Sequence, residues 1–487
     1  MTTLELAFQT FTLAPCSELT APTLRLLDFP HELLSSVLEH LSSISDRKSL
    51  SICARICRRL QSPSQELLFA LWEPKTSCET DTLESLKNLS AILDESPHLG
   101  RYIRSFWVFL GRLSDNNCSP SNTMYFGHAH RPSYSFEKPS TASNAYQYTS
   151  RILPRLTHLK TLFIKPLGFE VATVNWTSKV DVPMDVRNAL GRVLRGADLN
   201  SVIVESVDGF DLGVFGEVDR IKAIEFYGTT LAAQDYIDSS VSSPIFRDHK
   251  CRLNSMTYYL GSGNASSTFV DYCLDSQRCI LSLNSLTHLH LRDPGDRSGL
   301  NLLSGLLEHC SATLVHLELL YNTETDSRWE PPNLAPLSYL KSLRLTLWLS
   351  PSFLRLPEIT HQDRCQQVLQ ILNTMKPDSP SNLGYQLPDY QISCLPPVPL
   401  VSLALSFNVR HRFDVVDKLL SKHKWDRLDE GLVSLKKKGT VSLNEVEIIY
   451  RAKVSEDMIW KREGEQATLP DLRAQGVNVS LSMESLC

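Results

Sequence analysis

The chain has 487 residues, of which 42% are hydrophobic and 21% charged, the composition of an ordinary globular protein. Its formal net charge of −5 excludes a broadly basic surface, so nucleic acid is not expected as a partner. No stretch approaches the roughly 20 apolar residues that a membrane-spanning helix needs, and no basic residue precedes the apolar N-terminal positions as in a secretory signal. We therefore expect a cytoplasmic or nuclear protein without a membrane partner.

The cysteines indicate a reducing compartment. Twelve are scattered along the chain, and the close pairs are Cys53/Cys57 and Cys273/Cys279. These spacings form neither a Cys-x-x-Cys metal knuckle nor a short disulfide framework. The cysteines are therefore predicted to be reduced thiols in the core.

Three short helical patterns lie between Phe29 and Trp72. Pro30 suits a first helical turn, because its missing N–H would have no partner there. The apolar positions that follow fall on one helical stripe: Leu33, Leu34, Val37, Leu38 and Leu41.

The next two helices are predicted from caps and spacing. The second follows Asp46, with apolar residues at heptad-like intervals: Leu50, Cys53, Cys57 and Leu60. The third opens at Ser62, because Ser62 and Gln65 have the spacing of a capping box. A bundle this small buries little surface and should depend on a partner or on the following domain.

This order of residues from Phe29 to Phe69 resembles the F-box, above all as it occurs in fungal proteins that couple it to leucine-rich-like repeats. The resemblance implies a tail at 1–23 and an F-box-like domain at 24–74 that docks on a Skp-type adaptor of a cullin-based ubiquitin ligase. It assigns the adaptor contact to Phe29, Pro30, Leu33, Leu34, Val37, Leu38, Leu41, Leu50 and Cys57. The alternative is that the leucines only fill a local core, although so short a bundle cannot hide all of them.

The phrase Leu-x-x-Leu-x-Leu recurs through the rest of the chain, usually after a helix-like stretch. Clear copies begin at Leu159, Leu286, Leu314, Leu340 and Leu400, and weaker ones at Ile103, Leu199, Ile221, Leu253 and Leu443. Alternation at this period is typical of parallel strands joined by helical crossovers.

We therefore predict an α/β protein in which an N-terminal three-helix F-box-like bundle precedes a leucine-rich-repeat-like solenoid with a curved parallel sheet over 75–487. Two stretches without the phrase, near 114–144 and 376–399, are expected to be surface excursions. Residues 469–481 are expected to form a short helix or turn and a closing strand that caps the sheet edge.

The intervening residues of each phrase indicate a binding surface. In a strand, period two buries the leucines and sends the residues between them to the opposite, concave face. The candidate substrate-binding residues are His288, His290, Arg292, His316, Glu318, Tyr321 and Arg344. Because strands stack at about 4.8 Å, His290, Glu318 and Arg344 should form a charged ladder. The alternative is a solvated sheet face whose charges only keep the protein soluble.

No motif of catalysis is present. The sequence lacks a Gly-x-x-x-x-Gly-Lys phosphate loop, a Gly-x-Ser-x-Gly elbow and a His-Glu-x-x-His helix, so we expect no enzyme, no catalytic residue and no cofactor. The strand histidines and the pair His128 and His130 are zinc-ligand types, but no further ligand has suitable spacing, and no metal is expected. An enzyme with its site in 114–144 is a third reading.

These patterns together indicate recognition without chemistry. The F-box-like bundle would recruit the ligase, and the repeat domain would hold an unknown protein substrate for ubiquitination. A repeat scaffold for protein–protein interaction that recruits no ligase is the competing interpretation.

Overall fold

The computed structural model describes residues 30–43, 46–56, 58–74, 79–110, 141–167, 173–179, 181–196, 198–215, 218, 220–231, 251–259, 273, 281–292, 297–321, 331–349, 357–375, 399–409, 425–452 and 469–485. The chain divides into two compact units, Met1–Leu71 and Trp72–Cys487, so the division falls three residues before the expected one. The tail at 1–23, Phe29, Cys57, the His128/His130 pair and almost all of the two expected excursions lie outside the described residues.

The first unit contains α2 (His31–Ser43), α3 (Arg47–Ile56) and α4 (Arg58–Ala70). The carbonyl of Pro30 accepts hydrogen bonds from the Leu33 and Leu34 amides, which starts α2 where the sequence predicts a helix. Asp46 caps α3, because its Oδ1 accepts the Ser49 N–H at 3.0 Å and its Oδ2 accepts the Ser49 hydroxyl at 2.6 Å. The predicted start of the second helix is confirmed.

The third helix does not begin at Ser62. It begins at Arg58 and contains Pro63 in its interior, and Leu60 belongs to this helix and not to the preceding one. Pro63 has no N–H to donate along the helix, which normally favours a break at this point. Leu60 is 2% exposed, and burying its side chain stabilises a helix that begins before the capping-box position at Ser62.

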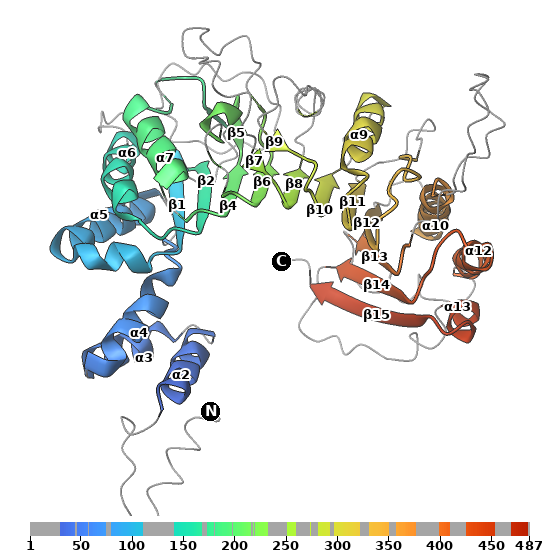
Figure 1. Ribbon diagram of the computed structural model, residues 1–487, viewed down its shortest axis with the longest axis horizontal. Coiled ribbons are helices and arrows are strands. Elements are labelled where there is room, and N and C mark those ends of the chain that lie inside the picture. The colour runs from blue at the N-terminus through green and yellow to red at the C-terminus, as the bar shows by residue number, and fades with distance from the viewer. Residues whose placement is uncertain are drawn as a thin grey trace, which may run out of the picture. The chain divides into compact units, whose positions relative to one another are not determined.

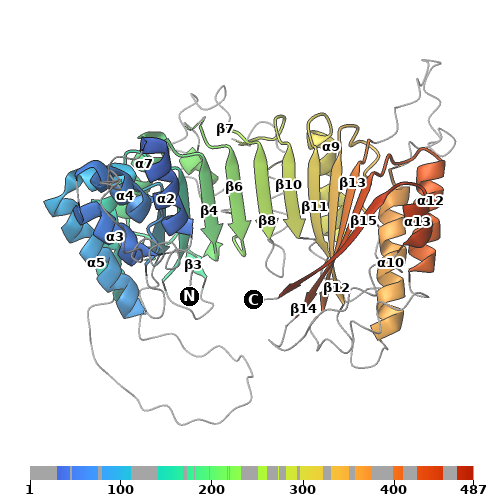
Figure 2. The same ribbon diagram turned by 90° about the horizontal axis from the view of Figure 1, so that it is seen from below.

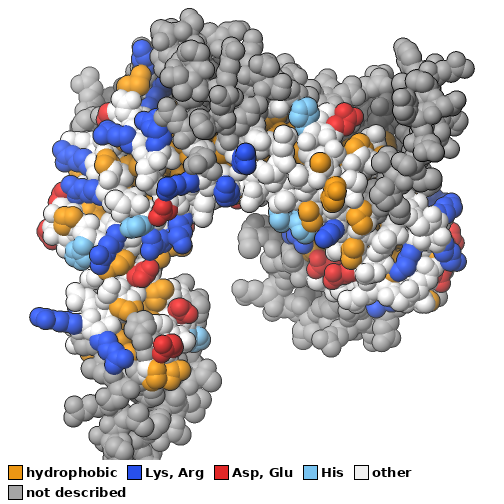
Figure 3. Space-filling model, in the orientation of Figure 1, with side chains coloured by type: hydrophobic (Ala, Val, Ile, Leu, Met, Phe, Trp, Pro, Cys, Tyr) orange, Lys and Arg blue, Asp and Glu red, His pale blue; other side chains and the backbone are white. Residues whose placement is uncertain are grey.

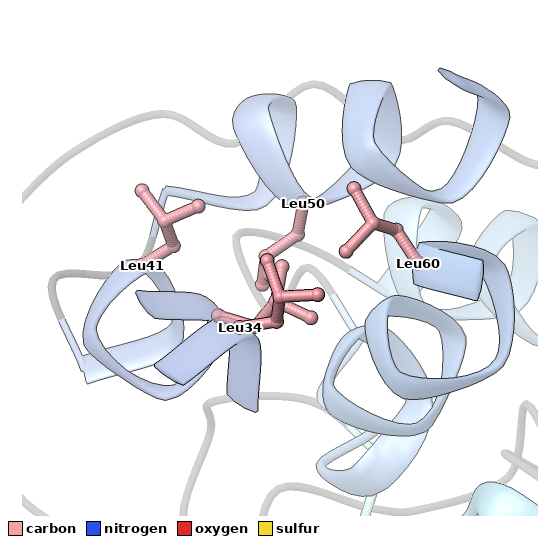
Figure 4. Close-up of a cluster of buried hydrophobic side chains, with 5 residues drawn as sticks. Leu34, Leu41, Leu50 and Leu60 are labelled. Carbon is pink, nitrogen blue, oxygen red and sulfur yellow. The ribbon is translucent and has the colours of Figure 1, made fainter. Parts of the chain in front are cut away.

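Five leucines from the three helices form the core of this unit. Figure 4 shows Leu34 and Leu41 from α2, Leu50 from α3 and Leu60 from α4 turned toward one another. Leu38 completes the cluster, and all five side chains are at most 7% exposed. The bundle therefore has an apolar core of its own.

The second unit is built on one parallel sheet of eleven strands that lie in chain order, as Figure 2 shows. The strands are β1 (Ser105–Leu110), β2 (Thr161–Pro166), β4 (Ser201–Glu205), β6 (Ala223–Tyr227), β8 (Ser255–Tyr259), β10 (His288–Arg292), β11 (His316–Tyr321), β12 (Ser342–Leu349), β13 (Ser402–Val409), β14 (Glu445–Ala452) and β15 (Asn478–Ser485). Every neighbouring pair is parallel. The sheet is open, with β1 and β15 as its two outer strands. The predicted α/β class with a parallel sheet is confirmed.

Helices of this unit pack along one side of the strands, on the outer side of the arc that the strands follow in Figure 1. The α-helices are α5 (Glu79–Glu95), α6 (Thr141–Ile152), α7 (Met184–Gly196), α9 (Arg297–Cys310), α10 (Pro357–Asn373), α12 (Asp426–Lys437) and α13 (Pro470–Ala474). Short 3₁₀ segments are η2 (Pro97–Tyr102), η3 (Leu153–Arg155) and η4 (Leu212–Phe215). None of the described helices has the length and apolar character needed to cross a membrane.

Not every crossover is an α-helix. Between β4 and β6 the chain forms β5 (Val207–Asp208) and η4, and β5 pairs with β3 (Val174–Asn175) in a separate small sheet. Phe210 from this connection lies 5.9 Å from Phe215 and 6.1 Å from Phe226, between ring centroids. Phe210 and Phe215 of this connection therefore pack beside Phe226 of β6. A second small pair, β7 (Cys251–Arg252) with β9 (Leu281–Ser282), precedes β8 and β10.

The first aliphatic residue of each phrase is an anchor that lies just before its strand. All ten are 0% exposed: Ile103, Leu159, Leu199, Ile221, Leu253, Leu286, Leu314, Leu340, Leu400 and Leu443. Each strand begins about two residues after its anchor, as β1 begins at Ser105 after Ile103. Every predicted copy, clear or weak, leads into a strand of the sheet.

The end of the chain forms the predicted short helix and closing strand, α13 and β15. Asp429 on α12 is buried and accepts the Asp471 and Leu472 amides at 2.8 and 2.9 Å, which caps α13 from a neighbouring helix. Strand β15 then pairs with β14 along eight residues. The other edge of β14 pairs with β13, so β15 takes the outer position.

Candidate interaction surface

The strands present a leucine face to the helices and a polar face on the opposite side. On β10, Leu289 and Leu291 are 2% and 7% exposed, whereas His288 and His290 alternate with them. The register pairs His290 with Glu318, and Glu318 with Arg344. The alternation and the alignment of these three residues are as predicted.

Seven polar-face residues on strands β6 to β14 form what we call the polar strip: Glu225, Tyr227, Tyr259, His290, Glu318, Arg344 and Glu447. The Tyr227 hydroxyl donates to Glu225 Oε2 at 2.5 Å, and the Tyr227 ring stacks on Tyr259 with centroids 4.9 Å apart. The Tyr259 hydroxyl lies 2.8 Å from His290 Nε2. Three successive strands, β6, β8 and β10, are thereby linked through side chains.

The strip continues across the next strands with charged groups. His290 Nε2 lies 3.4 Å from Glu318 Oε1, and their side chains are 24% and 25% exposed. Arg344 Nη2 lies 3.7 Å from Glu447 Oε2, with both side chains a little over a third exposed. The strip is therefore partly dehydrated at its centre and more solvated toward β14.

The predicted ladder of His290, Glu318 and Arg344 does not carry a charge at His290. Burial is the main cause that lowers the pKa of His290 to about 4, and the positive charges of Arg344 and Arg451 add to it. Burial also raises the pKa of Glu318, against the opposing effect of the same two arginines. At neutral pH His290 is a neutral hydrogen-bonding imidazole and not a cation, because burial disfavours its protonated form.

His288 and His316 lie side by side at the start of β10 and β11. Their rings stack with centroids 4.3 Å apart, and both residues are exposed. Burial, followed by the neighbouring His288 and Lys341, lowers the pKa of His316. Within the described residues, no group of three or more His, Cys, Asp or Glu side chains is placed to hold a metal ion.

Two predicted site residues are known only by their strand positions. Arg292 ends β10 and Tyr321 ends β11, and their side chains lie outside the described set. The register of β11 and β12 pairs Tyr321 with Leu347, and the assignment of Tyr321 to the binding surface stays a prediction.

Sequence reasoning missed Tyr227, Tyr259 and Glu447 as members of the strip. Each occupies a polar-face position in a weaker copy of the phrase, those beginning at Ile221, Leu253 and Leu443. The period-two rule applied to the weak copies would have found them. That the two tyrosines touch could not be known before the register of β6 and β8.

An aromatic cluster on β1 and β2 was also missed. The Trp107 and Phe163 rings stack with centroids 4.4 Å apart and 5° between planes. Lys165 Nζ lies 4.1 Å from the Trp107 ring centroid, a cation–π contact. Burial lowers the pKa of Lys165. This end of the polar face is more apolar than the centre.

The predicted adaptor-binding residues separate into two groups. Leu34, Leu38, Leu41 and Leu50 are buried in the bundle's own core and are not available to a partner. Leu33 and Val37, one turn apart on α2, are 52% and 46% exposed. Pro30 is exposed. The direct adaptor-contact role predicted for the four buried leucines is therefore replaced by a structural one.

Further apolar side chains are exposed on the same unit. Ile52 and Ile56, one turn apart on α3, are 50% and 62% exposed, and Leu71 is 46% exposed. The sequence prediction did not include them, because the expected stripe of α3 followed Leu50 and Cys53. Five large apolar side chains are thus exposed in the described part of this unit, which is the character of an interaction surface.

No protein-family model matches the chain, and no curated protein matches it either.

Proposed function

We propose that this protein is a substrate-recognition adaptor of a cullin-based ubiquitin ligase. Its first unit would dock on a Skp-type adaptor as an F-box-like bundle, and its second unit, a leucine-rich-repeat-like solenoid, would bind a protein substrate. The observation that carries the proposal is the pairing of two surfaces on one chain: exposed apolar side chains on a small helical unit, and a polar strip on a long parallel sheet.

The apolar residues of the first unit support the docking half of the proposal. Leu33 and Val37 lie beside the buried stripe of α2 and leave its apolar surface larger than its own core needs. Burying such side chains in a partner contributes roughly 1.5–3 kcal/mol each, which is enough for a few of them to drive association.

The polar strip supports the recognition half. Its tyrosines and Arg344 are residue types that anchor protein interfaces. The contacts from Glu225 to Glu318 hold these side chains in place before any partner arrives, so little side-chain entropy remains to be lost on binding.

In this proposal the chain makes and breaks no covalent bond. It holds a substrate lysine near a charged ubiquitin carrier, and the gain is effective concentration. His290 and Glu318 act only through binding.

The docking half is tested by pull-down of the full chain with a Skp-type adaptor. We expect wild type to be retained and the double variant Leu33→Asp/Val37→Asp to be lost, because two carboxylates would have to be dehydrated in the contact. Both positions are half exposed, so the bundle should keep its helical circular dichroism. Changing the buried Leu38 is unsuitable, because loss of binding would then follow from unfolding.

The matched control is Leu33→Met/Val37→Ile, which keeps the apolar surface and should keep adaptor binding. Wild type that fails to bind the adaptor contradicts the proposal. Equal retention of the aspartate variant and the control would show that α2 is not the contact.

The competing function is a repeat scaffold that recruits no ligase. The apolar core of the first unit favours this function, because a bundle with its own core does not need an adaptor in order to fold. This scaffold is expected to bind no Skp-type adaptor at all, while substitutions in the polar strip would still weaken a protein partner.

A further inference from the structure

The segments that lead into the first strands of the sheet carry a concentration of positive charge. Six residues form what we call the basic rim: Arg101, Arg104, Lys160, Arg220, Lys222 and Arg252. They precede β1, β2, β6 and β8, and Figure 3 shows lysine and arginine side chains gathered over this part of the sheet. The segment before β4, which lies between those of β2 and β6, contributes an acidic residue, Asp198.

Backbone hydrogen bonds align the rim positions from strand to strand. The Lys160 amide donates to the Arg104 carbonyl at 2.7 Å, and the Asn200 amide donates to the Lys160 carbonyl at 3.0 Å. The Lys222 amide donates to the Asn200 carbonyl, and the Asn254 amide to the Lys222 carbonyl, each at 2.8 Å. Arg104 and Lys160 therefore lie on adjacent strands about 4.8 Å apart, and Lys222 lies two strands further.

Local contacts orient part of the rim. Arg104 Nη1 donates to the His158 carbonyl at 3.3 Å. Asp198 lies 3.1 Å from Arg220 and 3.3 Å from His158 Nδ1, so one carboxylate is shared by two groups. Lys160, Lys222 and Arg252 are exposed. In a chain with a net charge of −5, the excess of positive charge among the described residues of this region would attract an acidic partner.

The neighbouring aromatic rings favour a polypeptide over single-stranded nucleic acid. Binding of single strands combines a basic track with aromatic rings that are free to stack on bases. The aromatic residues beside the rim, on β1 and β2, already have partners: Trp107 stacks on Phe163, and Lys165 lies over the Trp107 ring. Carboxylates need only the charge and the hydrogen-bond donors that the rim offers.

We propose that the basic rim binds an acidic, extended segment of a partner protein. This inference rests on charge and strand alignment and is independent of ligase recruitment by the first unit. The rim would add long-range attraction and orientation to any contact made by the polar strip, and its effect would fall as salt screens the charges.

The test is fluorescence anisotropy with the full chain and a labelled peptide of alternating Glu and Ser residues. We expect saturable binding that is lost when Gln replaces Glu in the peptide. The triple variant Lys160→Glu/Lys222→Glu/Arg252→Glu should bind the peptide about tenfold more weakly or not at all. Raising the salt from about 0.1 to 0.5 M should weaken wild-type binding.

The matched control is Arg427→Glu/Lys437→Glu/Lys438→Glu, which changes the net charge equally at exposed positions in and beside α12. It should bind the peptide within about twofold of wild type, since these positions precede none of the first strands. An equal loss in both triple variants would show that net charge alone attracts the peptide, and would overturn the proposal. Absence of wild-type binding, or tighter binding of a single-stranded oligonucleotide of equal charge, would overturn it as well.

Discussion

At the residue scale, His290 shows how burial changes the chemistry of a side chain that looks charged in the sequence. It lies between the Tyr259 hydroxyl and the Glu318 carboxylate, at 2.8 and 3.4 Å. A protonated imidazole there would face Arg344 and Arg451 as well as the loss of water, so the pKa falls to about 4. His290 therefore joins the tyrosine and glutamate parts of the polar strip as a neutral group.

This pKa predicts acid sensitivity. The unfolded chain binds the His290 proton near pH 6.5 and the folded chain only near pH 4, so the contribution to stability is complete above pH 6.5. It is lost as the pH falls from 6.5 to about 4, by roughly 3 kcal/mol. The variant His290→Gln should show a shallower fall of the free energy of unfolding across this window, measured by urea titration at several pH values.

Glu318 provides the control for that experiment. Its raised pKa has the opposite sign, because the folded chain holds this proton more tightly and stability is lost as the pH rises through the raised value. Glu318→Gln is the matched control and should steepen the acid response where His290→Gln flattens it. Identical pH slopes for wild type and His290→Gln would show that His290 is not buried in its neutral form.

At the element scale, the sheet is specified by many local signals that agree. Each phrase has an anchor that is fully buried before its strand and further aliphatic residues on the leucine face. Even the weak copies at Ile221 and Leu253 lead into strands β6 and β8. Period two is a property of any extended strand, so the facing of most residues follows from the sequence without knowledge of the neighbours.

The terminal elements α13 and β15 depend instead on a contact that is distant in sequence. Asp429→Ala should leave two amides at the start of α13, one buried and one partly buried, without their acceptor, at a cost of about 1–2 kcal/mol. We expect faster amide hydrogen exchange in α13 and β15 than in β10 or β11. Asp429→Asn retains one acceptor oxygen and should have a smaller effect. Uniform loss of protection across the whole sheet would contradict a local capping role.

At the scale of the whole molecule, the two units have separate cores. The first unit closes around Leu34, Leu38, Leu41, Leu50 and Leu60, and the second unit buries the anchors of its strands. A core of five leucines leaves the small bundle with only a few kcal/mol of stability.

Separate cores predict separate unfolding. Leu50→Ala should cost about 2–5 kcal/mol and unfold the first unit. Hydrogen exchange followed by mass spectrometry should then show loss of protection in α2, α3 and α4, while β10 to β13 keep theirs. Ile52→Ala, at a half-exposed position on the same helix, is the control and should change protection little. Parallel loss of protection in both units would mean that they unfold as one.

The sequence by itself determined the class, the order of strands and most of the polar face. Apolar residues at period two, each run preceded by a buried anchor, leave a chain few ways to hide them other than as neighbouring parallel strands. The predicted alignment of His290, Glu318 and Arg344 followed from that pattern alone.

Only the tertiary structure decided which apolar residues of α2 remain exposed, that α4 begins before Pro63, and that His290 is neutral. Leu33 and Leu34 are the same residue type one position apart, and which of them faces α3 and α4 depends on how three helices meet. Likewise, a histidine's pKa depends on the water it loses and on charges from other strands. Side-chain exposure and pKa both depend on residues that are close in space but distant in sequence, and no local pattern in the chain specifies those neighbours.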